Sequence, residues 1–178
     1  MPLNSKNNEC FVFITAAFNT LNRYVANIAA WLLFFAMLLT ASLVLLRYGF
    51  NIGSIASQEL VTYAHALAFM LGAAYTLQQN EHVRVDIFYQ RFSPTQQAWV
   101  NACGTLIFLL PVVIFLLASS WQMFINAWHI RESSADAGGL AFVYLLKAII
   151  PLAMFLLVLQ AVVELLNAAK TLIIRDAS

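Results

Sequence analysis

Long apolar runs separated by short polar segments are the main pattern of this chain. Four such runs, at about residues 28–46, 57–78, 97–121 and 141–166, contain few charged side chains. A helix rises ~1.5 Å per residue, so ~20 apolar residues are enough to cross a hydrocarbon core of ~30 Å. The pattern therefore predicts an all-α integral membrane protein with four transmembrane helices.

The segment before the first span, residues 11–27, has a different periodicity. Its apolar side chains follow one another in alternating steps of three and four, while polar side chains take other faces. The apolar positions are Phe11, Ile14, Phe18, Leu21, Val25 and Ile28, and the polar ones are Thr15, Asn19, Asn22 and Arg23. This is typical of an amphipathic helix. We expect it to lie flat in the membrane interface before the chain turns inward; the alternative is that it extends the first span.

The third span carries local signals at its start and in its middle. Ser93 and Pro94 are typical of an N-cap and a first helical turn. Pro111 lies well inside the span and leaves the carbonyl near Ile107 without its usual donor, which predicts a kink.

Composition supports the membrane assignment and excludes other classes. The 178 residues are 62% hydrophobic and 10% charged, whereas soluble domains have about 25% charged residues. This length holds four spans in one membrane domain, residues 1–178. A net charge of +1 gives no basic surface for nucleic acid.

The distribution of basic residues predicts the orientation, because Lys and Arg are retained on the cytoplasmic side. With four spans, the N-terminus, the middle loop and the C-terminus share one side. That side carries Lys6, Arg23, Arg84, Arg91, Lys170 and Arg175, and the other carries Arg47 and Arg131, with Lys147 just inside a helix. We therefore expect both termini to be cytoplasmic.

Three ionisable side chains fall inside the spans: Glu59, His65 and Lys147. Such a residue costs at least ~2.5–3.5 kcal/mol at mid-membrane, so it normally faces protein or water. Glu59 and Lys147 lie near the same end, where they either bridge spans two and four or snorkel separately. For His65 we favour a hydrogen-bonded structural role over a ligand or proton relay.

Small residues recur on the second span at Ala64, Ala68, Gly72 and Ala73. Small side chains let a second helix approach closely, so this face is expected to pack against protein.

No arrangement of residues indicates catalysis or a cofactor. The sequence has no Ser/His/Asp or Cys/His pattern, phosphate loop or metal spacing, and haem would need two histidines at compatible depth where only His65 lies in a span. We expect no enzyme activity and no cofactor. Because the carboxylates of the spans sit near helix ends, the spans suggest a scaffold more than a transport pathway.

Over about residues 28–166 the chain resembles the DctQ-like family, the small membrane subunits of tripartite ATP-independent periplasmic (TRAP) transporters. The resemblance rests on the four spans, on Arg47 after the first and on Glu59 opening the second. It also rests on the loop NEHVRVD at residues 80–86, with His82, Arg84 and Asp86, and on ESSADAGGLAFVYLLKAIIP at residues 132–151.

The resemblance implies a subunit of a bacterial inner-membrane transporter. A periplasmic substrate-binding protein would capture a substrate, usually an organic acid, and deliver it to a complex of this subunit with a large one. The large subunit would hold the substrate and sodium sites, and this subunit would brace it within the lipid and help dock the binding protein.

Two groups of residues are candidates for those roles. The loop from Arg131 to Gly139 combines mixed charge with two glycines, which suits a docking surface; its residues are Arg131, Glu132, Asp136, Gly138 and Gly139. Contacts between helices or with the large subunit are expected at Arg47, Glu59, Ala64, Ala68, Gly72 and Lys147. Two alternatives remain: a self-sufficient small oligomeric carrier, and a membrane anchor subunit of a respiratory enzyme.

Overall fold

A computed structural model describes residues 5–79, 89 and 91–176, and within these it is built from helices without strands. The elements are α1 (Ser5–Phe50), α2 (Ile55–Gln78), α4 (Pro94–Gly104), the π-helix η1 (Thr105–Leu109), α5 (Leu110–His129) and α6 (Val143–Asp176). The motif residues His82, Arg84 and Asp86 lie outside the described residues.

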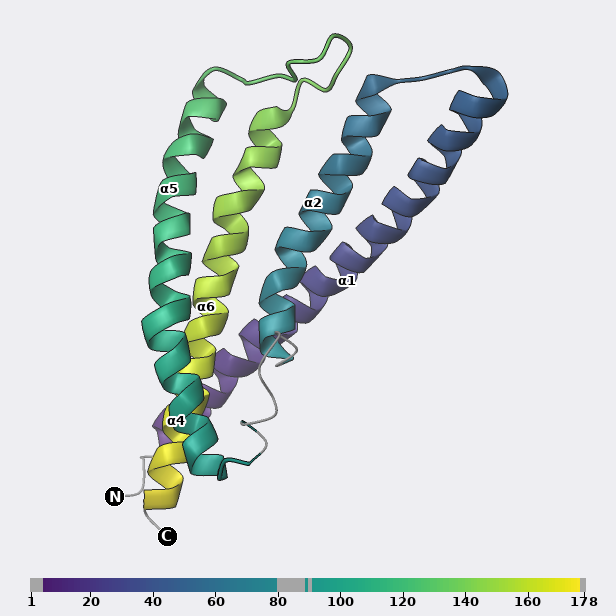
Figure 1. The fold of residues 1–178 in the computed structure, drawn as a ribbon. Coiled ribbons are helices and arrows are strands. Elements are labelled where there is room, and N and C mark those ends of the chain that lie inside the picture. The colour runs from purple at the N-terminus through teal and green to yellow at the C-terminus, as the bar shows by residue number, and fades with distance from the viewer. Residues whose placement is uncertain (1–4, 80–88, 90, 177–178) are drawn as a thin grey trace.

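Four stretches are long and apolar enough to cross a membrane: Thr15–Phe50, Ile55–Gln78, Pro94–His129 and Val143–Leu172. The first turn of α1 and the last turn of α6 lie at one end of the bundle, and the α1–α2 and α5–α6 connections lie at the other (Figure 1). The prediction of an all-α membrane fold is confirmed.

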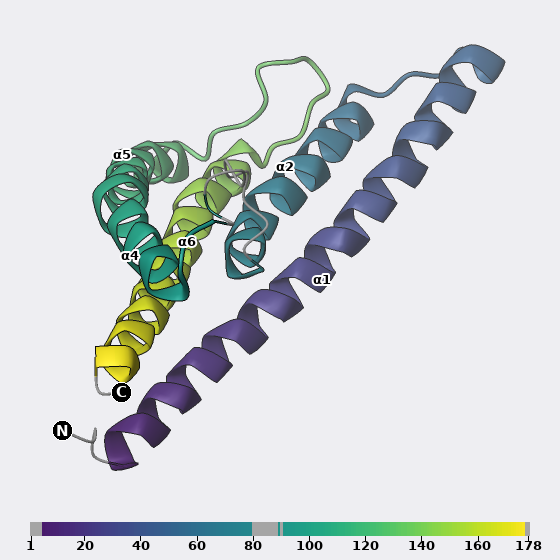
Figure 2. The same cartoon turned by 60° about the horizontal axis from the view of Figure 1, so that its bottom comes forward.

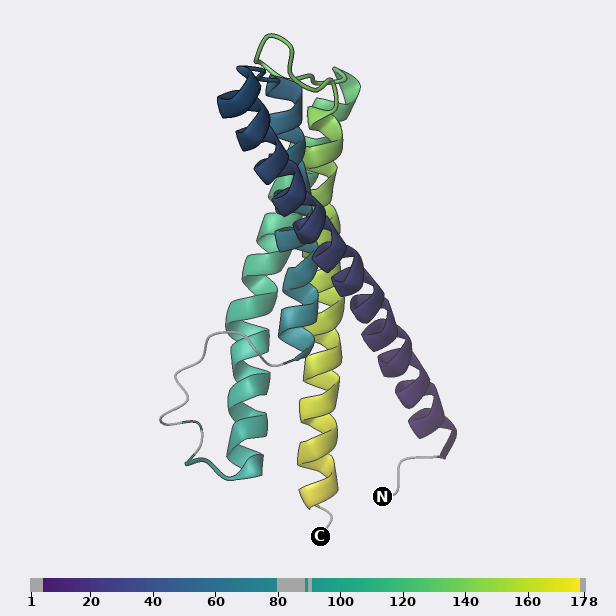
Figure 3. The same ribbon diagram turned by 90° about the vertical axis from the view of Figure 1, so that its right-hand side faces the viewer.

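The first helix differs from the sequence prediction. α1 is one unbroken helix of 46 residues, so the expected turn near Ile28 is absent and the segment 11–27 extends the first span. The reason is local, because no Gly or Pro interrupts the chain there. α1 crosses the other helices obliquely (Figures 2 and 3).

The face of α1 that packs against the bundle takes residues from both predicted faces, and Val25 of the apolar face is partly buried against the core. Asn22, Ala29 and Ala36, seven residues apart, are buried, while Leu21 and Ile28 of the predicted apolar face are exposed. A repeat of seven is the spacing of a helix that packs along one seam. Asn22, which the periodicity placed away from the apolar face, therefore faces the bundle.

The predicted start of the third span is confirmed. Ser93 caps α4 through a capping box with Gln96, and Pro94 occupies the first turn. Before Pro111, where a kink was predicted, the backbone forms the π-helix η1, in which the backbone N–H of Leu110 donates to the carbonyl of Thr105. A π turn is one of the known ways in which a helix absorbs such a disturbance.

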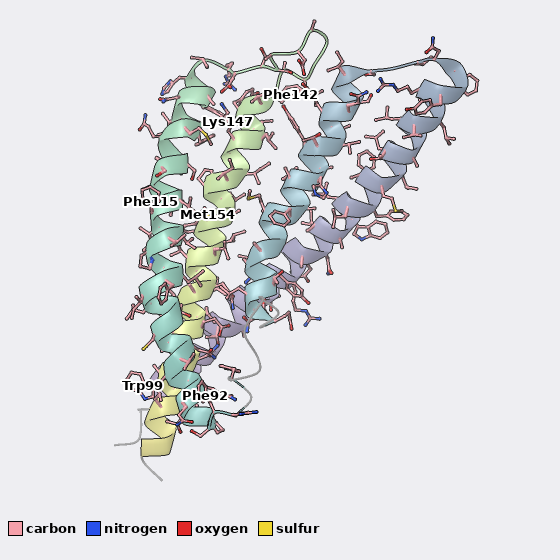
Figure 4. The ribbon with its side chains drawn as sticks, viewed as in Figure 1. Phe92, Trp99, Phe115, Phe142, Lys147 and Met154 are labelled. Atoms are coloured by element: carbon pink, nitrogen blue, oxygen red, sulfur yellow. The ribbon has the colours of Figure 1, made fainter. Side chains whose placement is uncertain are left out.

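α6 is the central helix and packs against α2, α4 and α5. Small and medium side chains fill the contacts, with Met154 lying between neighbouring helices (Figure 4). The core consists of Ala74 and Leu77 from α2, Val113 from α5, and Ala153, Met154, Leu156 and Leu157 from α6. This arrangement brings the start of α2 beside the loop that enters α6.

Candidate functional site: the α5–α6 loop and its supports

The α5–α6 loop, residues 130–142, is fastened to α2 by one carboxylate. Glu59, at the start of the second turn of α2, accepts a hydrogen bond from the Ser134 hydroxyl through Oε1 and one from the Leu140 backbone N–H, at 2.6 Å, through Oε2. The N–H of Ser134 also donates to the carbonyl of Leu140 at 2.9 Å, which closes the loop on itself. Glu59 thus binds both sides of the loop at its narrow point.

The two glycines of the loop have different reasons to be glycine. Gly138 has a φ of +86°, a left-handed conformation that side chains with a Cβ rarely adopt. Gly139 lies against Ser134 and Glu59, and a Cβ added to it would be 2.7 Å from Glu59 Oε1. The first glycine allows the turn, and the second allows the close approach of the loop to the carboxylate.

Lys147 pairs with the loop, not with α2. Its Nζ donates to both carboxylate oxygens of Glu132, at 2.7 and 2.6 Å, and each side chain is about 30% exposed, at 28% and 30%. Of the two alternatives left open for Glu59 and Lys147, the bridge between spans two and four is therefore not formed. The two residues share a depth, but Glu132 at the start of the loop lies nearer to Lys147, and Glu59 is occupied by two loop donors.

Arg131 is exposed and held by aromatic rings. Its guanidinium carbon lies 4.6 Å from the ring centre of Trp128 and 5.2 Å from that of Tyr144, and the two rings meet edge to face at 5.3 Å. A cation over an aromatic face is attracted by about 0.5–1 kcal/mol at exposed sites. Among the described residues no carboxylate pairs with Arg131, so its charge is fixed in place and available.

The five predicted docking residues therefore fall into two classes. Arg131 and Asp136 are exposed, as is Gly138, whereas Glu132 and Gly139 are half-buried in the supports of the loop. Lys147 lies at the same end of the bundle (Figure 4). The arrangement presents fixed charges to water, while the remaining polar groups hold its shape.

The predicted small-residue face of α2 is divided. Ala64 and Ala68 are buried inside the chain, but a Cβ added to Gly72 would find no atom within 4 Å. His65 is exposed and makes no hydrogen bond among the described residues. The structural hydrogen bond expected for it is thus absent within the described part of this chain.

Arg47 stands apart from the loop. It is exposed near the end of α1 and lines a groove of about 240 Å³ between α1 and α2, together with Tyr48 and Gln58.

Sequence reasoning also missed a buried polar contact between α1 and α6. Asn22 Nδ2 donates to Gln160 Oε1 at 2.7 Å, with both side chains buried, and joins α1 to α6. Gln160 Nε2 in turn donates to Glu164 Oε1 at 3.3 Å. The available signal was Gln160, the only amide side chain in the predicted span 141–166, since a buried amide in a membrane needs a partner; the choice among Asn19, Asn22 and Asn27 on the other helix had no such signal.

The described residues contain no group of three His, Cys, Asp or Glu side chains that could hold a metal ion. The loop cluster pairs carboxylates with hydroxyl, amide and ammonium donors, an arrangement that fixes backbone shape.

Comparison with known proteins agrees with this picture. The profile of the family "Tripartite ATP-independent periplasmic transporters, DctQ component" matches residues 36–171, a range that contains Arg47, Glu59 and the α5–α6 loop. Over 99 residues the chain is 27% identical to a Haemophilus influenzae protein named as a TRAP transporter small permease; the aligned segment is 56% of this chain and 62%, less than two thirds, of that protein. No solved structure matches the chain.

The family profile covers most of the chain, and the four apolar helices indicate a multi-pass protein of the inner membrane. The chain therefore belongs to the DctQ component family of TRAP transporters.

Proposed function

We propose that this subunit serves a sodium-coupled TRAP transporter that imports an organic acid delivered by a periplasmic binding protein. In this proposal it braces the large membrane subunit and helps the binding protein to dock. The observation that carries the docking role is the α5–α6 loop, which is fastened by Glu59 and by the Glu132–Lys147 pair while Arg131 and Asp136 stay exposed.

A loop held in one shape suits a surface that meets a soluble partner repeatedly. Ordering a loop at an interface costs free energy, and a loop already ordered avoids that cost. Exposed charges such as Arg131 and Asp136 mainly set the encounter rate and the register of a complex. The loop would recognise complementary charges on the binding protein.

The bracing role is supported by where the polar groups of the spans lie. Glu59, Lys147 and Arg47 sit within a few residues of helix ends, and the core around α6 is apolar. The described core contains no continuous series of ionisable side chains along the spans. Substrate and sodium would then be handled by the large subunit.

In this proposal both termini are cytoplasmic and the α5–α6 loop is periplasmic. A reporter placed at Ala135 should behave as periplasmic and one fused after Ser178 as cytoplasmic. The opposite result at Ala135 would put the loop out of reach of a periplasmic protein and would refute the docking role.

The docking role is tested by reversing the exposed charges with Arg131→Glu and Asp136→Lys. The complex with the large subunit is reconstituted in liposomes, and uptake is measured against the concentration of purified binding protein. We expect the half-saturating concentration to rise about tenfold, which corresponds to about 1.4 kcal/mol. The defect should change with ionic strength, because exposed charges are screened over ~8–10 Å.

Arg23→Glu is the matched control, since Arg23 is also exposed and lies in the first half of α1 by residue number. The start of α1 is at the end of the bundle opposite to the loop (Figure 1). It should leave the half-saturating concentration unchanged. All three variants should recover the large subunit in wild-type amounts. Wild-type uptake by the loop variants at every salt concentration would remove the docking role, and uptake by this chain without the large subunit would remove the bracing role.

A further inference from the structure

α2 carries a second stripe that is mostly exposed, and its first residue, Gln58, also lines the groove between α1 and α2. We call it the α2 outer seam, and its residues are Gln58, Thr62, His65, Phe69, Gly72 and Thr76. They follow one another in alternating steps of four and three, so at ~100° per residue they lie within an arc of about 80°. The first four are exposed and the last two half-buried.

The outer seam does not have the composition of a lipid-facing surface. On α5, exposed positions in the middle of the span are Val112, Ile114 and Phe115, and Phe115 lies on the outer side of that helix (Figure 4). On the outer seam only Phe69 is a large apolar residue. α2 is correspondingly the least apolar of the four spans.

Because of His65, a position of the outer seam against lipid only would be unfavourable. His65 lies ten residues after the start of α2 and six after Glu59, about 9 Å further along the axis than the carboxylate that supports the loop, and so inside the ~30 Å hydrocarbon core. Lipid tails offer no hydrogen bond to an imidazole, and polar side chains at this depth normally face protein or water. Within the described part of the chain His65 has no hydrogen-bond partner.

The neighbours of His65 leave room for another helix. The hydroxyls of Thr62 and Thr76 donate to carbonyls of their own helix, at 3.2 and 3.1 Å, and so present methyl groups. Gly72 has no atom within 4 Å of an added Cβ. Small residues spaced in this way allow close packing between helices in a membrane, and alternating steps of four and three form a continuous contact seam.

We propose that the α2 outer seam receives one transmembrane helix of the large subunit, which places a polar side chain or an unwound backbone carbonyl opposite His65. The proposal rests on the bracing role argued above and names the face that carries it. Hydrogen-bonding complementarity selects protein over lipid as the occupant, because lipid tails cannot satisfy the imidazole at that depth. The bracing role then makes that protein the large subunit.

The direct test is photo-crosslinking in the assembled complex. A benzophenone amino acid replaces Phe69 in one variant and Phe115 in another, two phenylalanines with matched exposure of 71% and 68%. Illumination of membranes that contain both subunits should give a product of the combined mass from position 69, in at least several-fold higher yield than from position 115. Equal or lower yield from position 69, or a product that contains two copies of this chain, would overturn the proposal.

A second test addresses His65 itself. His65→Leu should reduce the recovery of the large subunit on a tag attached to this chain by about tenfold, His65→Asn should restore part of it, and Phe115→Leu should leave it unchanged. Wild-type recovery with His65→Leu would show that the imidazole has no partner on the large subunit. If the wild-type chain fails to recover the large subunit, the bracing role itself is wrong. If the wild-type chain recovers the large subunit but position 69 gives no adduct, only the contact at the outer seam is wrong.

Discussion

Removing either partner of the Glu132–Lys147 pair should loosen the α5–α6 loop from α6. Lys147 Nζ meets both carboxylate oxygens of Glu132 at 2.6–2.7 Å. Glu132→Gln and Lys147→Met each delete one charge with little change of volume. Each single variant leaves the other charge unpaired in a half-buried position. Each substitution should therefore lower the free energy of unfolding more in the wild-type chain than in a chain whose other partner has already been replaced.

The magnitude follows from distance and exposure. Two charges at ~4 Å attract by about 1 kcal/mol in water and about 4 kcal/mol at an effective dielectric constant of 20. The pair is closer than that, but its side chains are 28% and 30% exposed, and desolvation and lost side-chain entropy offset much of the attraction. We therefore expect a coupling free energy of about 1–2 kcal/mol.

A double-mutant cycle on unfolding of the purified chain in detergent, by heat or by dodecyl sulfate, measures this coupling. The charge-swapped variant, Glu132→Lys with Lys147→Glu, should recover part of the stability, because a carboxylate near the first turns of α6 is also favoured by the helix dipole. Single variants whose effects add within ~0.3–0.5 kcal/mol would show that the pair contributes no coupling.

Two further predictions concern the contacts of Glu59 and of Asn22. Gly139→Ala places a Cβ 2.7 Å from Glu59 Oε1, so the melting temperature should fall; an unchanged melting temperature would mean that the loop has room to move away at no cost. Asn22→Leu leaves Gln160 buried without its donor and should lower the free energy of unfolding by about 1–3 kcal/mol. The double variant, Asn22→Leu with Gln160→Leu, should recover much of that loss. A double variant as unstable as the single one would contradict this reasoning.

The features that sequence reasoning predicted are those that depend on neighbouring residues. The four spans follow from local apolar length, the cap at Ser93 from residues within one turn, and the disturbance near Pro111 from one missing backbone donor. The turn expected near Ile28 is absent, and the cause is again local. Periodicity suggested an amphipathic segment, but nothing in the chain there ends a helix.

The contacts that build the site could not be predicted in this way. Glu59 meets partners 75 and 81 residues away in the sequence, and Asn22 meets one that is 138 residues away. Sequence position gives the depth of a residue in the membrane but not its lateral position. Their similar depth left a pairing of Glu59 with Lys147 possible. The α5–α6 loop lies between them and binds each one separately, Glu59 through Leu140 and Lys147 through Glu132.

α2 shows why a membrane helix needs its neighbours before its faces can be interpreted. In a soluble helix the polar stripe faces water and needs no partner, but within a hydrocarbon core a polar stripe requires protein contact. The small residues of α2 suggested one packing face, yet Ala64 and Ala68 pack inside the chain while Gly72, about 40° further round the helix, belongs to the outer seam with His65. Only the positions of α1 and α6 separate the two stripes. A helix with small residues on one side and polar residues on the other has little surface suited to lipid, so α2 is best placed between its own bundle and a second membrane protein.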